Sequence, residues 1–380
     1  MTGRDRIRAI VSGERPDRFP IGEVDAWAET VERWQGEGMP QGATPTEALG
    51  LLDPDHSIEL PLNLNMVPEF EIRILEEGER HVTLVDEFGV TKKMLRYDFD
   101  TTRGRKTDAG RMSAMSQWIS FPVKDMASWK TILEERFTPA LEDRLPKDWS
   151  QQKAAFVKDS KDRWVTFFCF PLVGMFGPLR ELFGFENLIY LMVDSPDLIH
   201  TVLDDLTDFW LRSFDGVLRD GVHLDQITFF EDMCSTRSSL IGPSMFREFL
   251  SPRYKRVIGE LRSMGVSLFS LDTDGNAWPI LPDMISAGLN GISPCEVSAA
   301  MDAGRLLKAF PTLYLDRGIA KGALAEDLAA IDTEMEVRFQ TAWDQSRYTP
   351  NLDHLAPPNI PWQNIQHYAK RYLELAHAPL

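Results

Sequence analysis

Short apolar runs that end in polar residues alternate with amphipathic helical stretches throughout residues 161–380. Regular strand-helix alternation is typical of parallel strands joined by right-handed crossovers. One further strand is expected near Phe19 and another in the middle of the chain, so the pattern predicts an α/β fold, a (β/α)₈ TIM barrel. The runs span residues 164–170, 226–232, 266–274, 291–296, 313–318 and 348–354, and the main helical stretches span 196–219, 243–264, 301–310 and 323–345.

Residues 1–160 are less regular, and we expect them to add an N-terminal extension with a lid and a β-hairpin insertion. Residues 36–61 are rich in glycine and proline, which indicates a long loop or lid. Residues 81–96 alternate between apolar and polar side chains around a glycine, and this pattern predicts the hairpin. Both parts, 1–160 and 161–380, are expected to belong to a single domain.

The chain carries 41 Lys and Arg against 58 Asp and Glu, which gives a net charge of −17. Such a charge repels phosphate backbones and anionic lipid surfaces, so neither nucleic acid nor a membrane is an expected partner. Cys169, Cys234 and Cys295 are too few and too far apart for a disulfide scaffold or a thiolate zinc site. Cys295 is expected to be a small buried residue, and no role is assigned to Cys234. Without an apolar signal segment, a cytoplasmic location is expected.

Polar residues end every candidate strand after residue 220. In a TIM barrel the loops after the strands hold the active site, so these side chains are expected to meet at one rim. A rim lined with acids can hold a cation through oxygen and imidazole ligands, or it can raise a carboxyl pKa until that group serves as a general acid. The residues at the strand ends are Glu231, Asp232, Asp272, Asp274, Glu296, Asp316, Arg317, Asp353 and His354.

Each of these residues also has an ordinary structural interpretation. Asp232, Asp274 and Asp316 are equally able to cap helices that begin after their strands. Glu231 follows an apolar run, where burial would require a polar partner. Trp27, Trp34 and Trp278 lie near glycine-rich segments and are candidates for lining an apolar pocket, although core packing is the alternative.

Seven segments then carry a family resemblance, residues 4–18, 33–42, 231–255, 272–276, 287–297, 318–324 and 348–358. The most specific are FREF…P.YK within 246–255 and DH..PP over 353–358. On these motifs the sequence resembles the uroporphyrinogen decarboxylase superfamily, and within it the corrinoid-dependent methyltransferase-like branch. The resemblance implies a TIM barrel with its active site at the C-terminal rim. It also implies a homodimer, since barrels of this superfamily are often dimeric.

The chain departs from the true decarboxylases of that superfamily near its N-terminus. Those enzymes carry an Arg-Gln-Ala-Gly-Arg type of stretch that binds substrate carboxylates, whereas residues 21–27 here read IGEVDAW. A chain of net charge −17 without that arginine cluster is a poor host for a porphyrinogen with eight carboxylates. Decarboxylation of that substrate is therefore not expected.

The resemblance also bears on a metal site. Related methyltransferases often bind zinc through a His-x-Cys pair and a later Cys, which correspond here to Asp272, Asp274 and a position near His354. Either the site is rebuilt with oxygen ligands, or it is weakened or lost. The expected ligands of a divalent metal, with zinc as the first choice, are Asp272, Asp274, Glu296 and His354.

The resemblance implies a demethylase component, a methyltransferase that moves a methyl group from a small O-, N- or S-methyl compound to the Co(I) corrinoid of a separate protein. In this hypothesis Glu231 or Asp232 donates a proton and Arg317 orients the substrate. Asn276 is expected to contact the substrate together with the three tryptophans. The alternative is a metal-free decarboxylase or related lyase, in which Arg317 binds the carboxylate of a small substrate and Asp232 or Asp274 stabilises a cationic intermediate.

Overall fold

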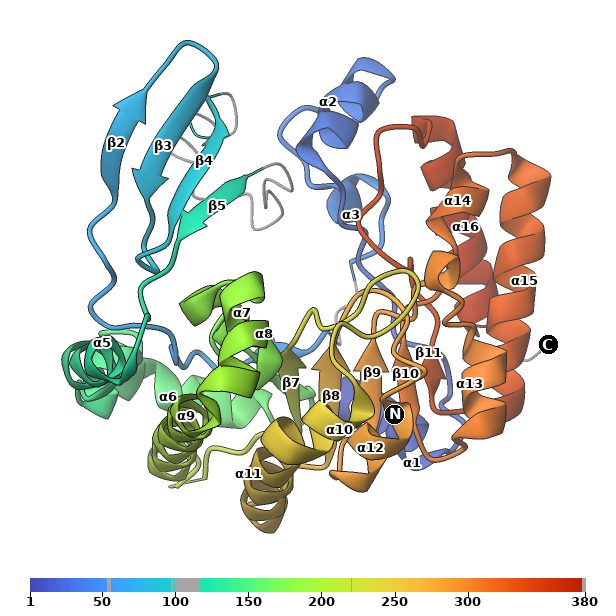
Figure 1. Ribbon diagram of the computed structural model, residues 1–380. Coiled ribbons are helices and arrows are strands. Elements are labelled where there is room, and N and C mark those ends of the chain that lie inside the picture. Colours follow the sequence, from blue (N-terminus) through green and yellow to red (C-terminus); the bar gives the residue numbers. More distant parts are fainter. Residues whose placement is uncertain (53–55, 97–98, 100–115, 220, 378–380) are drawn as a thin grey trace.

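A computed structural model describes residues 1–52, 56–96, 99, 116–219 and 221–377 (Figure 1). Its centre is a seven-stranded parallel sheet in the order β1-β6-β7-β8-β9-β10-β11. Every neighbouring pair in this sheet is parallel, as the strand-helix alternation predicts. The strands are β1 (Ile58–Glu59), β6 (Val165–Phe168), β7 (Gln226–Phe230), β8 (Leu268–Asp272), β9 (Gly291–Ser293), β10 (Tyr314–Asp316) and β11 (Tyr348–Thr349).

The sheet confirms the α/β class and six of the predicted strands, but it differs from a complete eight-stranded barrel. The seventh strand is β1, which lies at residues 58–59 and not in the middle of the chain, where a further strand was expected. The strand expected near Phe19 was wrong, because the Phe19 ring packs in the core against Phe339 and Trp343 and the segment around it belongs to no strand. A single parallel bridge from Ala26 to Ala356 is formed on that side. The described strands therefore form a half-barrel, and their pairing does not close it.

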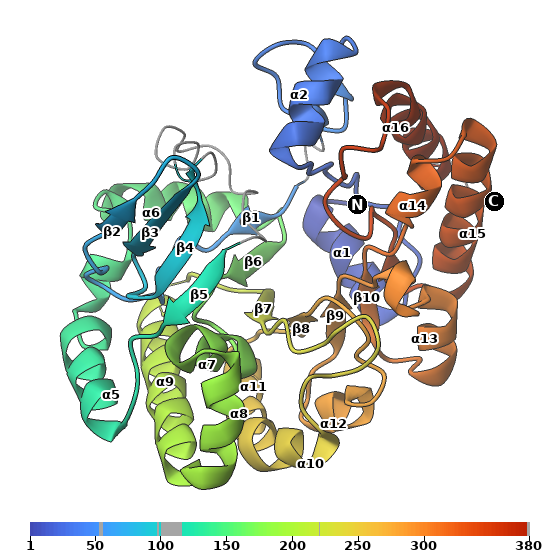
Figure 2. The same ribbon diagram turned by 45° about the horizontal axis from the view of Figure 1, so that its top comes forward.

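Helices pack against the outer face of this sheet (Figure 2). Phe167 of β6 contacts Phe214 of α9 edge to face, and Phe229 of β7 contacts Tyr254 of α11 in the same way. Since side chains alternate along a strand, the residues between these point to the inner face. The main helices are α1 (Gly3–Ser12), α2 (Ala28–Gly36), α3 (Pro45–Ala48), α5 (Met126–Ile132), α6 (Trp149–Asp159), α7 (Phe176–Phe183), α8 (Phe185–Asp194), α9 (Pro196–Val217), α10 (Pro243–Met245), α11 (Ser251–Ser263), α12 (Leu281–Ser286), α13 (Ala303–Ala309), α14 (Lys321–Leu324), α15 (Leu328–Gln345) and α16 (Trp362–His377).

The predicted hairpin is the centre of a second, antiparallel sheet in the order β2-β3-β4-β5. It buries a small core of its own, made by Val82, Leu84, Met94 and Phe99. Figure 1 shows this sheet on the same side of the molecule as α2, beyond the ends of the parallel strands. The strands are β2 (Arg73–Glu77), β3 (His81–Val85), β4 (Thr91–Leu95) and β5 (Gln117–Ser120).

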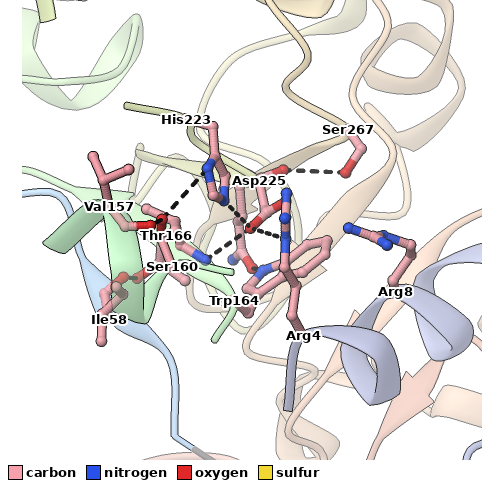
Figure 3. Close-up of polar contacts among 12 residues, drawn as sticks. Arg4, Arg8, Ile58, Val157, Ser160, Trp164, Thr166, His223, Asp225 and Ser267 are labelled. Carbon is pink, nitrogen blue, oxygen red and sulfur yellow. Dashed lines mark hydrogen bonds and ion pairs between the residues drawn. The ribbon is translucent and has the colours of Figure 1, made fainter. Parts of the chain in front are cut away.

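The opposite end of the parallel sheet is held by a buried carboxylate, Asp225, which immediately precedes β7 (Figure 3). Its Oδ1 accepts a hydrogen bond from Arg4 Nη2 of α1 at 2.7 Å, and its Oδ2 accepts one from the Val165 backbone N–H at 3.0 Å. Ser267, just before β8, donates to its backbone oxygen. This end of a parallel barrel supports stability rather than chemistry, and the contacts fasten α1 to three strands.

None of the helices in the described residues is long and apolar enough to cross a membrane.

Candidate active site

Side chains from five neighbouring strands form one layer at the carboxyl ends of the parallel sheet. Phe230 is paired in register with Asp272, Asp272 with Ser293, and Asp316 with Thr349. Ser293 Oγ donates to Asp316 Oδ2 at 3.4 Å, which joins the two halves of the layer. Paired residues of parallel strands point to the same face, so all five side chains face the inner side of the half-barrel. Of the residues expected at the rim, this layer contains Asp272 and Asp316.

Four cationic or ionisable side chains around this rim, Arg180, His354, Lys321 and Arg317, each contact a carboxylate that comes from another part of the chain. An exposed ion pair contributes little to stability by itself, but each of these pairs neutralises one positive charge at the rim. In the described part of the chain the pairs are Arg180–Asp232 at 3.4 Å, His354–Asp274 at 3.4 Å, Lys321–Glu296 at 3.5 Å and Arg317–Asp25 at 3.8 Å. The His354 pair carries charge when its ring is protonated.

Asp272 differs from these carboxylates, because no hydrogen bond or ion pair reaches its side chain from any described residue. Burial raises the pKa of Asp272 to about 7, and the charges of Asp232 and Asp274 act in the same direction. Arg317 and His354 offset part of that rise. Asp272 is therefore a carboxyl group that changes its charge near neutral pH while facing the inside of the half-barrel.

The pKa values of the two neighbouring aspartates, Asp232 and Asp274, shift in opposite directions. Burial raises the pKa of Asp232, and Arg180 opposes that rise only in part. Burial also disfavours ionisation of Asp274, but the bond from His354 and the charges of Lys321 and Arg317 outweigh it and lower the pKa. Asp232 has φ 44°, a left-handed conformation that is unusual for a residue other than glycine. The backbone is thus constrained where the chain leaves β7 for the rim.

Glu231 was predicted as a proton donor, and the structure places it elsewhere. Its side chain is fully buried and accepts hydrogen bonds from the backbone N–H groups of Met175 at 2.5 Å, Phe176 at 2.5 Å and Gly177 at 3.0 Å. The Tyr254 hydroxyl donates to it as well. These bonds satisfy the free N–H groups at the start of α7, so Glu231 anchors that helix and does not face the rim.

The predicted metal ligands come near one another without forming a metal site. Asp274 is paired with His354, while Glu296 accepts from the Gly275 N–H at 3.2 Å and from Lys321. The ranges that the structure describes contain no group of three His, Cys, Asp or Glu side chains able to hold a metal ion. The donor set therefore does not fit zinc or another divalent ion, since Asp274 and Glu296 are engaged by His354, Lys321 and a backbone N–H group, and of the four expected ligands Asp272 is the one left without a described partner.

Aromatic side chains lie beside Asp272 at the rim. Phe230 is its partner in the layer, and the Phe170 ring packs edge to face on Phe230 with centroids 4.6 Å apart. Phe168, the last residue of β6, is paired in register with Thr228 and faces the same side one layer lower. Phe168 and Phe170 are 38% and 36% exposed, which is unusual for phenylalanine. They give the mouth an apolar side next to its acids.

The residues predicted to bind substrate are dispersed. Trp34 is fully buried, packs on Trp362 and donates from Nε1 to the Ile360 oxygen, so it belongs to the core. Trp27 precedes α2, and Trp278 donates to the Ala300 oxygen. Asn276 accepts from the Trp278 N–H and forms a local turn.

Sequence reasoning missed three members of the ion pairs, Arg180, Lys321 and Asp25. Lys321 follows β10 by a few residues, so its position after a strand could have revealed it. Arg180 lies on α7, and Asp25 lies in the extended segment beside Ala356. No local pattern connects either one to the rim, because both reach it only through the tertiary fold.

The sequence profile of the family described as uroporphyrinogen decarboxylase (URO-D) matches residues 179–374, just over half of the chain. This protein belongs to the uroporphyrinogen decarboxylase family. The resemblance noted from the motifs is thereby confirmed. The matched region begins in α7 and contains the rim residues described above except Asp25, Phe168 and Phe170.

Comparison of solved structures places this family member beside a methyltransferase from Methanosarcina mazei, with a TM-score of 0.55 and 18% identity over 98% of this chain and 99% of that one. At this identity the likeness shows a shared fold. A vitamin-B12-independent methionine synthase from Listeria monocytogenes gives a TM-score of 0.31 and 14% identity over 58% of this chain and 68% of that one, too low to bear on the fold. No curated protein sequence matches.

Proposed function

We propose that this protein is a methyltransferase that takes a methyl group from a small O-, N- or S-methyl compound and passes it to the Co(I) corrinoid of a separate protein. The family and the fold shared with a methyltransferase support a methyl-transfer activity. The observation that carries the proposal is Asp272, a carboxyl at the strand ends that lacks a protein partner and has a pKa of about 7. Groups with such perturbed pKa values gather at active sites.

Methyl transfer needs charge control at the atom that loses the methyl group. When the bond between the methyl carbon and that atom breaks, the electron pair stays on the leaving atom. An ether oxygen would become an alkoxide and needs a proton, whereas a positively charged nitrogen or sulfur leaves as a neutral atom and needs only a counter-ion beforehand. Asp272 is suited to either task, as a neutral acid below about pH 7 or as a carboxylate above it.

The remaining rim residues position the donor and the loops around it. Arg180 fixes the chain after β7 by donating to the Asp232 backbone oxygen at 2.7 Å and pairing with its carboxylate. Lys321 and Glu296 tie the loops after β9 and β10 together. The corrinoid supplies the nucleophile when its carrier protein docks, and the present chain supplies orientation and charge. No step here uses a metal bound by this chain, because the predicted ligands do not fit one.

The proposal is tested by mixing the purified protein with methyl donors and a reduced corrinoid protein, and by following the loss of the Co(I) absorbance. We expect a donor-dependent change that Asp272→Asn slows by at least about a hundredfold, the usual contribution of one positioned acid or charge. Asp208→Asn is the control, since Asp208 pairs with Arg256 on the surface. If no donor gives the change, or if the protein alone releases carbon dioxide from a small acid, the lyase alternative replaces this proposal.

A further inference from the structure

The charge balance of the rim indicates which donor the site accepts. Arg180, Lys321 and Arg317 each already contact a carboxylate of the protein, and His354 contacts Asp274. An anionic substrate that bound to one of these three cations would have to displace a protein carboxylate. The Asp272 carboxylate forms no hydrogen bond or ion pair with any described residue, and Arg317 and His354 act on it only from a distance. A ligand with a positive charge would provide the ion-pair partner for Asp272.

The surface next to Asp272 suits a cation that carries methyl groups. Phe230 is its neighbour in register, and the Phe170 ring stands at 74° to the Phe230 ring. Phe170 and Phe168 keep more than a third of their surface exposed toward the mouth, although burial would be favourable for both. Aromatic faces beside a carboxylate are the combination that recognises quaternary ammonium groups, because the ring face attracts the cation and the ring body contacts its methyl groups.

We infer that the site takes a methylated onium cation, a quaternary ammonium or a tertiary sulfonium compound. Asp272 acts as its counter-ion, and Phe170 and Phe230 contact its methyl groups. This inference rests on the proposed methyl transfer and narrows its substrate class. An ether of similar size would leave Asp272 without a counter-charge, and it would gain only the apolar contact with the rings.

The chemistry of such a donor balances without a proton. The electron pair of the acceptor forms the new bond to the methyl carbon, and the carbon–nitrogen or carbon–sulfur bond breaks with its pair retained on the heteroatom. The donor cation becomes a neutral tertiary amine or sulfide. A sulfide product has lost the charge that Asp272 attracts and binds more weakly than the donor, whereas a tertiary amine takes up a proton from water near neutral pH and leaves as an ammonium ion with one methyl group fewer.

The test compares two probes of nearly equal shape by calorimetry at pH 8. Choline carries a trimethylammonium group, and 3,3-dimethylbutan-1-ol carries a tert-butyl group in its place. We expect choline to bind at least about tenfold more tightly than the neutral alcohol, a difference in keeping with one charge-assisted contact and aromatic faces. Asp272→Asn should remove that difference, and Phe170→Leu should reduce choline affinity severalfold. Asp208→Asn should change neither value.

Equal affinity for the two probes, or choline binding that survives Asp272→Asn, would overturn the inference. Phe170→Leu provides an independent reading if the first variant does not fold. The result is separable from the proposed function. Turnover of methyl ethers without any preference for choline would refute the onium substrate and leave methyl transfer in place, whereas choline binding without transfer from any onium donor to a reduced corrinoid would refute the transfer and leave the cation site.

Discussion

Replacing Glu231 by glutamine separates the two interpretations of this residue most clearly. Two of the four donors that meet the carboxylate, Met175 N–H and Tyr254 O–H, point at Oε1, and the other two, Phe176 N–H and Gly177 N–H, point at Oε2. The amide nitrogen of glutamine must face one of these pairs. With the amide nitrogen toward Phe176 and Gly177, two buried N–H groups lose their acceptor. With it toward the other pair, the Met175 N–H loses its acceptor, whereas the Tyr254 hydroxyl can turn to accept from the amide. The size of the side chain is unchanged.

The cost of Glu231→Gln can be worked out from those contacts. A buried donor without a partner costs about 1–3 kcal/mol, and the remaining bonds to a neutral amide are weaker than bonds to a carboxylate, so the change reduces stability by about 3 kcal/mol after some local relaxation. With an unfolding entropy of about 2.1 cal/mol/K per residue, that loss lowers the melting temperature of a chain of this length by about 4 °C. The measurement is a thermal melt by circular dichroism at pH 8, where the native carboxyl, with a pKa of about 7, is mainly ionised.

Activity is measured on the same preparation well below the melting temperature. Because Glu231 anchors α7 and does not face the rim, the rate of methyl transfer and the KM of the donor should stay within about twofold of the native values. A variant with an unchanged melting temperature and a rate reduced by orders of magnitude would refute this reasoning. It would restore Glu231 as a catalytic acid.

Three further predictions follow from the same contacts. Because the pKa of Asp272 is raised, the folded state keeps a proton that the unfolded state loses above about pH 4. The free energy of unfolding should therefore decrease between about pH 4 and about pH 7. Denaturant titrations of Asp272→Asn should no longer show that decrease. Asp225→Asn should lower the free energy of unfolding by about 3 kcal/mol, because Arg4 loses its charge partner. Since the pKa of Asp225 is lowered, the difference in stability between the native protein and this variant should disappear as the pH falls below the usual aspartate value of 3.8. Elemental analysis of the purified protein should find zinc well below one equivalent, and a full equivalent removed by His354→Ala would show that the four predicted ligands do bind metal.

Much of the fold could be predicted from periodicity, because buried parallel strands are short apolar runs whose ends can be seen in the sequence. Gln226–Phe230 and Leu268–Asp272 lie within runs that the pattern identifies. The strand expected near Phe19 was wrong for a physical reason: an apolar side chain shows that a residue is buried, and Phe19 is buried between helices α15 and α16 rather than in the sheet.

The candidate site could be predicted only in part. The strand ends indicate Asp272, Asp274, Glu296 and His354 as candidates for one site. The sequence does not show that Lys321 pairs with Glu296, or that Asp274 pairs with His354, which engages the side chains that a metal would need. Glu231 and Asp232 are adjacent in the chain, yet Glu231 is buried against the start of α7 while Asp232 pairs with Arg180 at the rim. The close approach of Gly174 to the Phe230 backbone, where an added Cβ would lie 2.1 Å from the carbonyl oxygen, brings the start of α7 onto Glu231. Such contacts between distant segments leave no local pattern.

A crystal structure of the protein with choline tests the central claim most directly. The account predicts density for the trimethylammonium group beside the Asp272 carboxylate, with its methyl groups against Phe170 and Phe230, and with the ion pairs of Arg180 and Lys321 intact. Choline bound away from Asp272, or an Asp272 side chain turned to pair with Arg317 instead, would contradict it.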